Sequence, residues 1–350
     1  MNIFKDINPH KRSVKIWLIT STIMVFLMII VGGLTRITDS GLSMVDWRPI
    51  MGILPPLNSQ SWIAAFNAYK LSPEFKIINY SITLEEFKYI YWWEWSHRFL
   101  ARILGIIFIL PLIFFITKKI FSKKTIFILS FVLVLGLIQA LVGWWMVKSG
   151  LTDKPHVSSY RLSFHLGIAL IIFCILFWLS LNVILNVKEK NKFSPIIYIF
   201  YHFNFTLVFL TIISGTFMAG SDAGNAFNTF PLMGDKFIPD DYFLAEYGYF
   251  NIFENIVAIN FNHRWLGTFT FIFIVIFYSY LLLSNKISVD KFSISLVTIF
   301  IISQFILGIL TLIHNVPIIY ASMHQTNSIL LLASMLYSYH RHLFKKEIYE

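Results

Sequence analysis

Glu94 and His97 place an acid and a histidine three residues apart, where a polar segment meets a long apolar run. At this spacing both side chains project from the same face of a helix, so a proton-carrying group lies beside a potential metal ligand. The pattern returns as Asn260 and His263, and arginine follows the histidine in both copies. Because an amide replaces the acid in the second copy, we expect acid–base chemistry only at the first.

Two further histidines extend this pattern, so that four occupy equivalent places near the starts of apolar runs. A lone histidine on an apolar face is usually a core residue, but four in register indicate ligands. Two imidazoles on facing helices suit the axial positions of a haem iron, whereas zinc would favour cysteine or carboxylate partners. We therefore predict haem sites formed within each repeat by His97 with His165 and by His263 with His324, with pairing across the repeats as the alternative.

Four arginines lie near the same ends of the apolar runs. They could bind haem propionates through paired hydrogen bonds, or reach lipid headgroups instead. They are Arg36, Arg98, Arg161 and Arg264.

The other histidines have no counterpart in this pattern. His156 and His314 lie near helix ends on the same side of the predicted helices as the four matched histidines, and they could assist a site there. Cys174 lies inside an apolar run, so no internal disulfide or thiolate metal site can form, and we expect it to fill the core. The remaining four lie at or near the other end of the predicted helices, where we expect surface or interface roles: His10, His202, His340 and His342.

The composition is that of a membrane protein. Of the 350 residues, 57% are hydrophobic and 13% are charged, and the mean hydropathy is +0.70, more than a soluble surface can carry. The apolar runs are long enough to cross a bilayer as helices, whereas barrel strands would alternate in short segments. We predict an all-α integral membrane protein with eight transmembrane helices, at about 15–35, 98–117, 125–147, 164–186, 196–219, 264–284, 292–313 and 325–343.

Basic residues concentrate in the short connections between apolar runs, so the net charge of +10 orients the helices and does not indicate nucleic-acid binding. The positive-inside rule predicts cytoplasmic termini and long outer loops at 36–96 and 220–262. The first apolar run is too long for a signal-peptide core, so we expect a retained helix. Within the first loop, aromatic residues at 57–93 favour an interfacial belt, with a lid over a site as the alternative.

The chain is predicted to be a duplication, with an N-terminal unit of residues 1–190 and a C-terminal unit of residues 191–350. Each unit has four helices that start from the same side, so we expect two parallel four-helix bundles related by a pseudo-two-fold axis along the membrane normal. The matches are Asp39-x-Gly41 with Asp222-x-Gly224, Met51-Gly52 with Met233-Gly234, and Gln139 and Gly143 with Gln304 and Gly308.

Together these motifs resemble the haem A synthase family, the membrane enzymes that oxidise the C8 methyl group of haem O to a formyl group. The resemblance spans nearly the whole chain. Some members carry a cysteine pair in the first outer loop, and this chain resembles the branch without it. The motifs are Gly32-Gly33-Leu34-Thr35-Arg36 through Pro55-Pro56, Glu94-x-x-His97-Arg98, Tyr160-Arg161-Leu162-x-x-His165-Leu166, Phe261-Asn262-His263-Arg264-Trp265-Leu266-Gly267 and His324-Gln325-Thr326-Asn327.

The resemblance implies a bacterial inner-membrane protein with one haem per half, toward the outer face. His263 and His324 would ligate a haem B cofactor, while His97 and His165 would face the substrate, haem O. The contrast between Glu94 and Asn260 leads to the same division and makes Glu94 the candidate catalytic residue, with helix capping as its alternative role. Expected partners are haem O synthase, cytochrome oxidase assembly factors, an electron acceptor that the sequence does not identify, and a second copy of the chain.

Two other classes of function are alternatives. A di-haem b-type electron-transfer protein, similar to a quinol oxidoreductase, would keep both haems permanently and usually stack them at two depths. A transporter with a histidine-lined pathway would need polar residues near mid-helix, which are only scattered in this chain. Extraction of the bound porphyrins separates the first alternative from a synthase, because only a synthase would hold haem A or haem O beside haem B.

Overall fold

The computed structural model describes residues 10–45, 53–152, 155–185, 194–284 and 290–344. In this part of the chain all regular elements are helices, and no strand occurs. Eight of the helices have 23 to 34 residues, and each corresponds to one predicted apolar run. They are α1 (Lys11–Ile37), α4 (Leu84–Thr117), α5 (Lys123–Gly150), α6 (Ser159–Ile184), α7 (Pro195–Gly220), α9 (Ile256–Leu283), α10 (Lys291–Ile313) and α11 (Ile318–Leu343).

Within the described residues, seven of these helices are long and apolar enough to cross a membrane, which makes the chain a multi-pass membrane protein. The helix outside this set is α11, whose buried side chains include Asn327, Ser334 and Ser338. These polar groups face the interior of the bundle and lower the mean hydropathy of α11. The crossing of the membrane by α11, as an eighth span, therefore stays a prediction.

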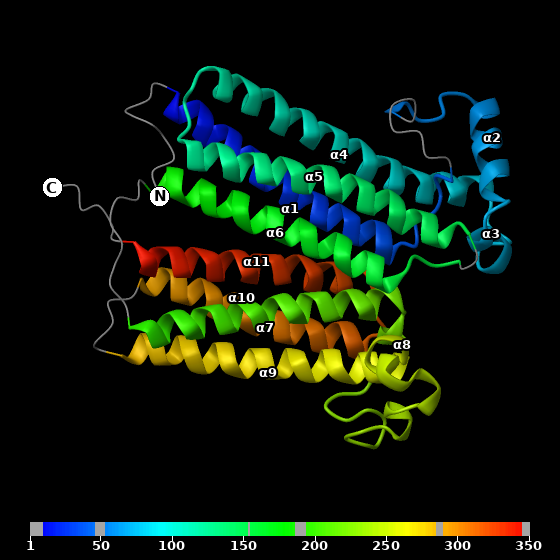
Figure 1. Cartoon of the computed structure of the whole chain (residues 1–350). Helices are drawn as coiled ribbons and strands as arrows, with labels where there is room; N and C mark the ends of the chain where they lie inside the picture. Colours follow the sequence, from blue (N-terminus) through cyan, green and yellow to red (C-terminus); the bar gives the residue numbers. More distant parts are fainter. Residues whose placement is uncertain (1–9, 46–52, 153–154, 186–193, 285–289, 345–350) are drawn as a thin grey trace.

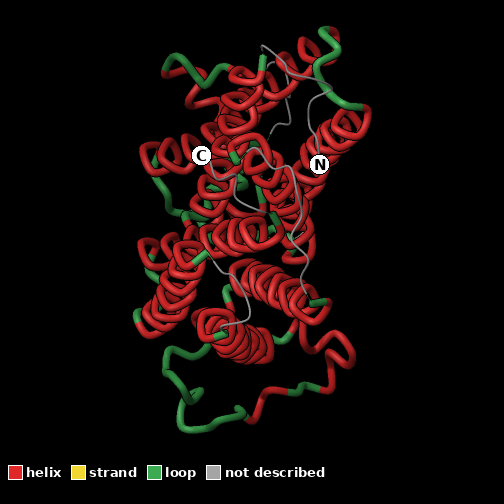
Figure 2. Tube along the Cα trace, turned by 90° about the vertical axis from the view of Figure 1, so that its left-hand side faces the viewer, coloured by secondary structure: helices red, strands yellow, loops and turns green. Residues whose placement is uncertain are grey.

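The long helices run side by side in two groups (Figure 1). One group contains α1, α4, α5 and α6, and the other contains α7, α9, α10 and α11. Contacts between α6 and α7 and between α1 and α11 join the groups, so α1, α6, α7 and α11 form the centre of the molecule. Figure 2 shows the bundle from the end at which α1 begins and α11 ends.

Equivalent turns follow the first helix of each group. Asp39 after α1 and Asp222 after α7 both adopt left-handed backbone angles, with φ of 47° and 53°. Aspartate tolerates this conformation because its short side chain can bond locally. The turns lie at the end of the bundle that carries the short helices α2 (Ser59–Tyr69), α3 (Pro73–Ile77) and α8 (Asn251–Glu254).

The predicted outer loop 36–96 is wrong at its end, because α4 begins at Leu84. A capping box starts the helix: the Thr83 side chain accepts from the Glu86 backbone, and Glu86 accepts from the Thr83 backbone. The residues in the first three turns of α4 are too polar to be predicted as part of a transmembrane helix from their hydropathy. The predicted apolar run therefore began only near residue 98. The predicted loop 220–262 likewise contains α8 and the start of α9.

The interfacial aromatic belt predicted for 57–93 is wrong for several of its members. Phe66 and Tyr69 of α2 are buried with Phe87 and Tyr91 of α4, and Met44 completes this cluster. Trp62 packs against its edge, with its ring centroid 5.1 Å from that of Tyr91. The aromatic residues therefore form the small core that holds α2 and α3 on the N-terminal part of α4.

Candidate functional site

His263 of α9 and His324 of α11 face each other in the C-terminal half. Their ring centroids lie 6.5 Å apart, and their planes are nearly perpendicular, at 87°. The two imidazoles approach each other from different helices. The side-chain amide of Gln304 on α10 lies 3.2 Å from Nδ1 and 3.4 Å from Nε2 of His324, so this ring also has a protein partner.

Ser214 of α7 is hydrogen-bonded to the imidazole of His263. Its hydroxyl donates to the carbonyl of Thr211 at 2.8 Å and lies 2.7 Å from Nδ1 of His263. When the single serine hydrogen is on the Thr211 carbonyl, Nδ1 of His263 is the donor in this second bond. The lone pair of Nε2 is then free to bind a metal.

The chemistry of this pair fits haem iron. His263 and His324 would hold such a group through their imidazoles, which are nitrogen donors that haem iron accepts. Among the described residues, no group of three or more His, Cys, Asp or Glu side chains could hold a metal ion by itself. A pair of imidazoles suits an iron whose other ligands come from a porphyrin.

His97 of α4 and His165 of α6 form the corresponding pair in the N-terminal half. The two side chains lie within electrostatic range of each other. Nδ1 of each ring is buried and has no hydrogen-bond partner among the described residues. Buried polar atoms in proteins almost always have partners, so two unsatisfied nitrogens at one place fit a site that receives a ligand.

A glycine on the neighbouring helix lies against each of the four imidazoles. A Cβ atom added to any of these glycines would lie between 2.9 and 3.2 Å from Cε1 of its histidine. A side chain there would push the ring aside, so the glycines allow the helices to approach and fix the rings. The sequence matched Gly143 with Gly308 but indicated no contact for either. The pairs are Gly32 with His97, Gly143 with His165, Gly215 with His263 and Gly308 with His324.

The four pairs lie at one end of the bundle. Each glycine falls within the last two turns of its helix, at the end where the two Asp-containing turns and α2 and α3 are found. The two predicted haem sites therefore lie at similar depth, beside each other rather than one above the other.

Glu94 is buried, with 2% of its surface exposed. Its Oε2 accepts hydrogen bonds from the hydroxyl of Ser43 and the backbone N–H of Met44, both at 2.7 Å. Arg98 forms an ion pair with Oε1. Since α4 begins at Leu84, Glu94 lies in the helix interior, and the alternative that it caps this helix is wrong.

Asn260, the counterpart of Glu94, is fully buried and holds the equivalent segment of the other half. Its amide donates to the carbonyl of Ala223 at 2.7 Å. Glu94 therefore connects the turn after α1 to α4, which carries His97. Asn260 connects the turn after α7 to α9, which carries His263. Only the Glu94 contact includes a charge.

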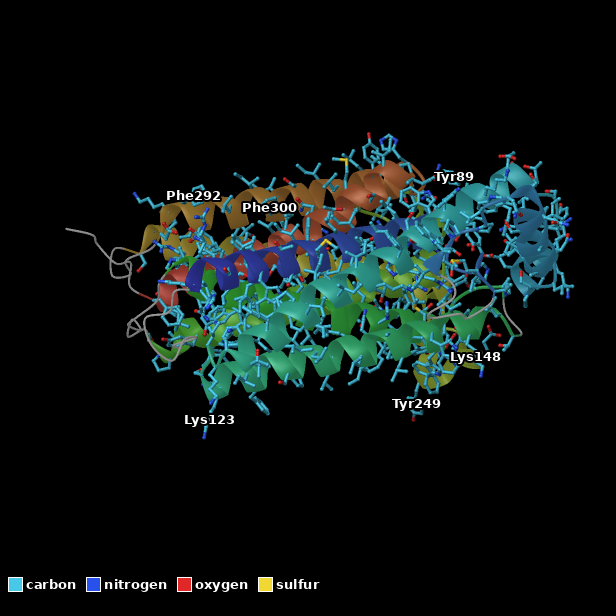
Figure 3. All side chains as sticks on the ribbon, turned by 90° about the horizontal axis from the view of Figure 1, so that it is seen from above. Tyr89, Lys123, Lys148, Tyr249, Phe292 and Phe300 are labelled. Atoms are coloured by element: carbon cyan, nitrogen blue, oxygen red, sulfur yellow. The ribbon has the colours of Figure 1, made fainter. Side chains whose placement is uncertain are left out.

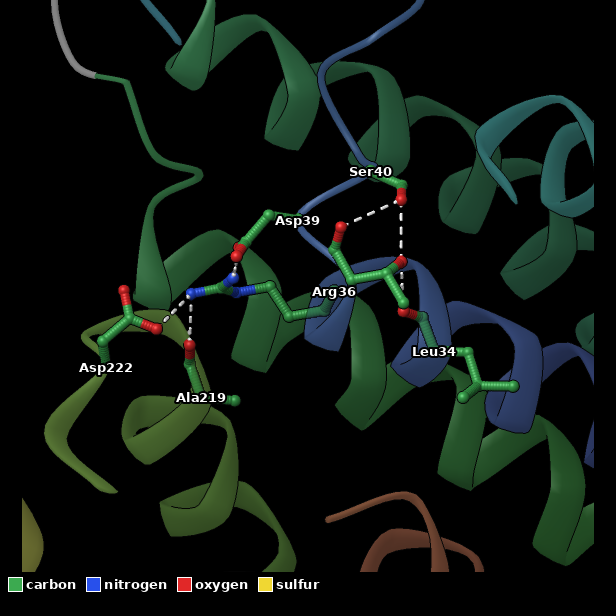
Figure 4. A network of polar contacts seen from close by, with 7 residues as sticks. Leu34, Arg36, Asp39, Ser40, Ala219 and Asp222 are labelled. Carbon is green, nitrogen blue, oxygen red and sulfur yellow. Dashed lines mark hydrogen bonds and ion pairs between the residues drawn. The ribbon is translucent and has the colours of Figure 1, made fainter. Parts of the chain in front are cut away.

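Arg36 joins the two halves (Figure 4). It forms ion pairs with Asp39 and with Asp222, the latter at 3.0 Å, and donates to the carbonyl of Ala219. In the predicted duplication, Ala219 is the counterpart of Arg36, and Asp222 is the counterpart of Asp39. Positions related by a two-fold axis can touch only near that axis, so this contact agrees with the predicted arrangement of the halves.

The other three arginines also contact protein groups. Arg161 donates to the carbonyl of Trp145 and stacks over its ring, 4.2 Å from the centroid. Arg264 donates to three loop carbonyls, at 2.7 to 3.1 Å. Arg98 donates to the carbonyl of Met44 and to Glu94. Propionate binding by any of the four arginines stays a prediction.

Arg98 also lines a cavity of about 220 Å³ near the N-terminal part of α4 and the C-terminal end of α5. Met44, Trp144 and Lys148 contribute further to its wall. Lys148 lies near the C-terminal end of α5, and Lys123 marks the opposite end of that helix (Figure 3). The cavity thus adjoins the helix segment of Glu94 and His97 and presents two cations.

Of the surface or interface roles predicted for His340 and His342, the surface role is wrong. Only 1% and 2% of their surfaces are exposed, because α11 ends in the centre of the bundle. His340 donates to Oδ1 of Asn182 at 3.0 Å, and His342 is hydrogen-bonded to Tyr201. His202 is exposed as predicted, and His156 and His314, expected near the sites, are also exposed.

Comparison with known proteins agrees with these features. The family model COX15-CtaA, described as cytochrome oxidase assembly protein, matches residues 15–336. A heme A synthase of Nitrosospira multiformis is 39% identical over 94% of this chain and 93% of its own length. A heme A synthase of Wolbachia sp. subsp. Brugia malayi is 42% identical over 93% of this chain and 95% of its own length. A heme A synthase of Rickettsia felis is 41% identical over 94% of this chain and 98% of its own length. The chain therefore belongs to the COX15-CtaA family of cytochrome oxidase assembly proteins.

Proposed function

We propose that this protein is a haem A synthase, an oxidoreductase that converts the C8 methyl group of haem O into the formyl group of haem A. The family and its heme A synthase members support this reaction. The observation that carries it is the contrast between two sites of similar construction. One has an oriented imidazole pair beside a neutral amide, and the other has unsatisfied imidazoles beside a buried carboxylate.

In this proposal the C-terminal half holds a haem B cofactor through His263 and His324. Ser214 orients His263, and Gly215 and Gly308 hold the two rings in place. Haem B would supply one-electron redox chemistry when bound. Neutral surroundings suit this role, because no proton needs to be accepted from a substrate there.

The N-terminal half would receive haem O between His97 and His165. Conversion of a methyl group into a formyl group removes four electrons, and protons leave with them. Glu94 can accept such a proton or stabilise positive charge that develops nearby, since it is buried close to His97. Arg98 lines the adjoining cavity and is the arginine best placed for a propionate.

The site positions also bear on the alternative of a di-haem b-type electron carrier. Such a protein conducts electrons across the bilayer through haems at two depths, whereas the four histidine–glycine pairs lie at one end of the bundle. We place this end at the outer face of a bacterial inner membrane, with both termini cytoplasmic, from the distribution of basic residues.

The proposal is tested by porphyrin extraction from cells that lack their own haem A synthase and express this chain with a haem O synthase. We expect haem A in the extract and haem B with the purified protein. His97→Ala should keep haem B and abolish haem A. If the wild-type protein yields only haem B, with haem O unchanged in the cells, the electron-carrier alternative replaces the synthase.

A further inference from the structure

Two adjacent glycines of α1 contact the two halves separately. Gly32 lies against the imidazole of His97, with 3.0 Å between an added Cβ and Cε1. Gly33 lies against the side chain of Gln325 on α11, the residue that follows His324. Gly32 therefore contacts the predicted substrate site, and the next residue, Gly33, contacts the helix that carries a predicted cofactor ligand.

The contact at Gly33 is close. A Cβ atom added there would lie 1.7 Å from Oε1 and 2.0 Å from Nε2 of Gln325. The amide of Gln325 donates to the carbonyl of Ile29, one turn earlier on α1, at 2.8 Å. Gln325 therefore occupies the space that the missing side chain of Gly33 leaves, and its hydrogen bond fixes it there.

The other half contains the reciprocal contact. Gly215 lies against the imidazole of His263, and the next residue, Thr216, is hydrogen-bonded to Ser163 of α6. Ser163 precedes His165 by two residues. Each of these glycines is therefore followed by a residue that contacts the other half. Gly33 contacts α11, which carries His324, and Thr216 contacts α6, which carries His165.

We propose that these two contacts, Gly33 with Gln325 and Thr216 with Ser163, set the relative position of the two haem sites. Gln325 acts as a positioning residue: it docks α11 on α1 and so holds His324 at a fixed place relative to His97. The proposal rests on the proposed function only in taking both histidine pairs as haem sites. Its consequence is that a small change in one half alters the haem environment of the other half.

The test uses four variants of the full-length purified protein: Gly33→Ala, Gln325→Ala, the double variant, and Gly136→Ala. Gly136 has no atom within 4 Å of an added Cβ, so it is the matched helix control. The readouts are the EPR g-values of the low-spin ferric haem, haem content and the temperature of thermal unfolding. The g-values report the orientation of the axial imidazoles, which a merely structural role would leave unchanged.

We expect Gly33→Ala to shift the g-values of the haem in the opposite half and to reduce its occupancy severalfold. The double variant should restore both, because loss of the Gln325 side chain makes room for the new methyl group. Gly136→Ala should match the wild type. The proposal is overturned if Gly33→Ala behaves like Gly136→Ala, or if the double variant is no better than Gly33→Ala.

Thr216→Val provides a second test, because it keeps the shape of the side chain and removes the hydroxyl. It should alter the spectrum of haem bound in the N-terminal half, and an unchanged spectrum there contradicts the proposal. These spectra do not require haem A formation. If the shifts and the rescue occur but no haem A forms, the positioning role stands and the proposed reaction fails.

Discussion

His263 and His324 lie with ring centroids 6.5 Å apart and planes at 87° to each other. Axial imidazoles with nearly perpendicular planes give a strongly anisotropic low-spin EPR signal. We expect this signal from the wild-type protein and its loss in His263→Ala, because the remaining imidazole cannot complete the axial pair. His97→Ala should retain the signal. Equal loss of both haems in His263→Ala, in protein that still folds, would contradict separate sites.

Glu94→Gln should retain haem B and accumulate haem O or its hydroxylated intermediate. Glutamine keeps the size of the side chain but cannot take up a proton, so haem A formation should fall by about a hundredfold or more. Ser43→Ala is the matched control, since it removes one hydrogen bond to Glu94, worth about 1 kcal/mol, and keeps the carboxylate. Near-normal haem A output from Glu94→Gln, or an equal loss in Ser43→Ala, would leave Glu94 with a structural role.

Gly308→Ala should weaken haem binding in the C-terminal half. The new methyl group would lie 2.9 Å from Cε1 of His324, so the ring must move from its place. Gly136→Ala should bind haem normally and gain up to about 1 kcal/mol from the higher helix propensity of alanine. Haem content per purified protein checks both results. Normal haem content in Gly308→Ala would show that the ring tolerates displacement.

Glu74 of α3 should make the stability of the region formed by α2 and α3 depend on pH. Burial raises the pKa of this carboxyl to about 8, and the nearby carboxylates of Glu94 and Asp39 add to the effect. The folded state therefore holds a proton that the unfolded state releases above its ordinary pKa of 4.5. Stability is highest below that value and falls as pH rises toward 8, by at most about 1.4 kcal/mol per pH unit.

Glu74→Gln should remove this dependence, because glutamine stays neutral and can still accept from Tyr69, whose hydroxyl lies 2.8 Å from Oε2 of Glu74. Thermal unfolding of the detergent-solubilised protein between pH 5 and pH 9 measures the difference. The variant should match the wild type near pH 5 and exceed it near pH 9. Parallel curves for the two proteins would mean that Glu74 does not titrate in this range.

The orientation in the membrane is tested by a reporter that is active only in the cytoplasm. Fusion after Lys190, in the basic connection between α6 and α7, should give a signal. Fusion after Asp240, in the segment between α7 and α9, should give none. The opposite result would place both histidine pairs at the cytoplasmic face.

The sequence by itself determined the long helices and the residue types of the candidate sites. Apolar runs of membrane length dictate helices wherever they occur, because backbone groups in lipid must bond within their own segment. The repeated pattern around His97 and His263 identified candidate ligands, since the order of residues in a helix decides which share a face. The hydropathy of the sequence did not predict the start of α4 at Leu84, where a capping box begins the helix within polar residues.

Only the tertiary structure decided which distant segments meet. The partners of Glu94 in the turn after α1, the ion pair of Arg36 with Asp222 and the burial of His342 all depend on how the helices pack. The motif that contains Gly33 does not reveal that the Gln325 side chain packs there, and the sequence around Gly136 does not reveal that it faces open space. Such contacts follow from the fit of whole helix surfaces, and the periodicity of one segment carries no information about the surface that will face it.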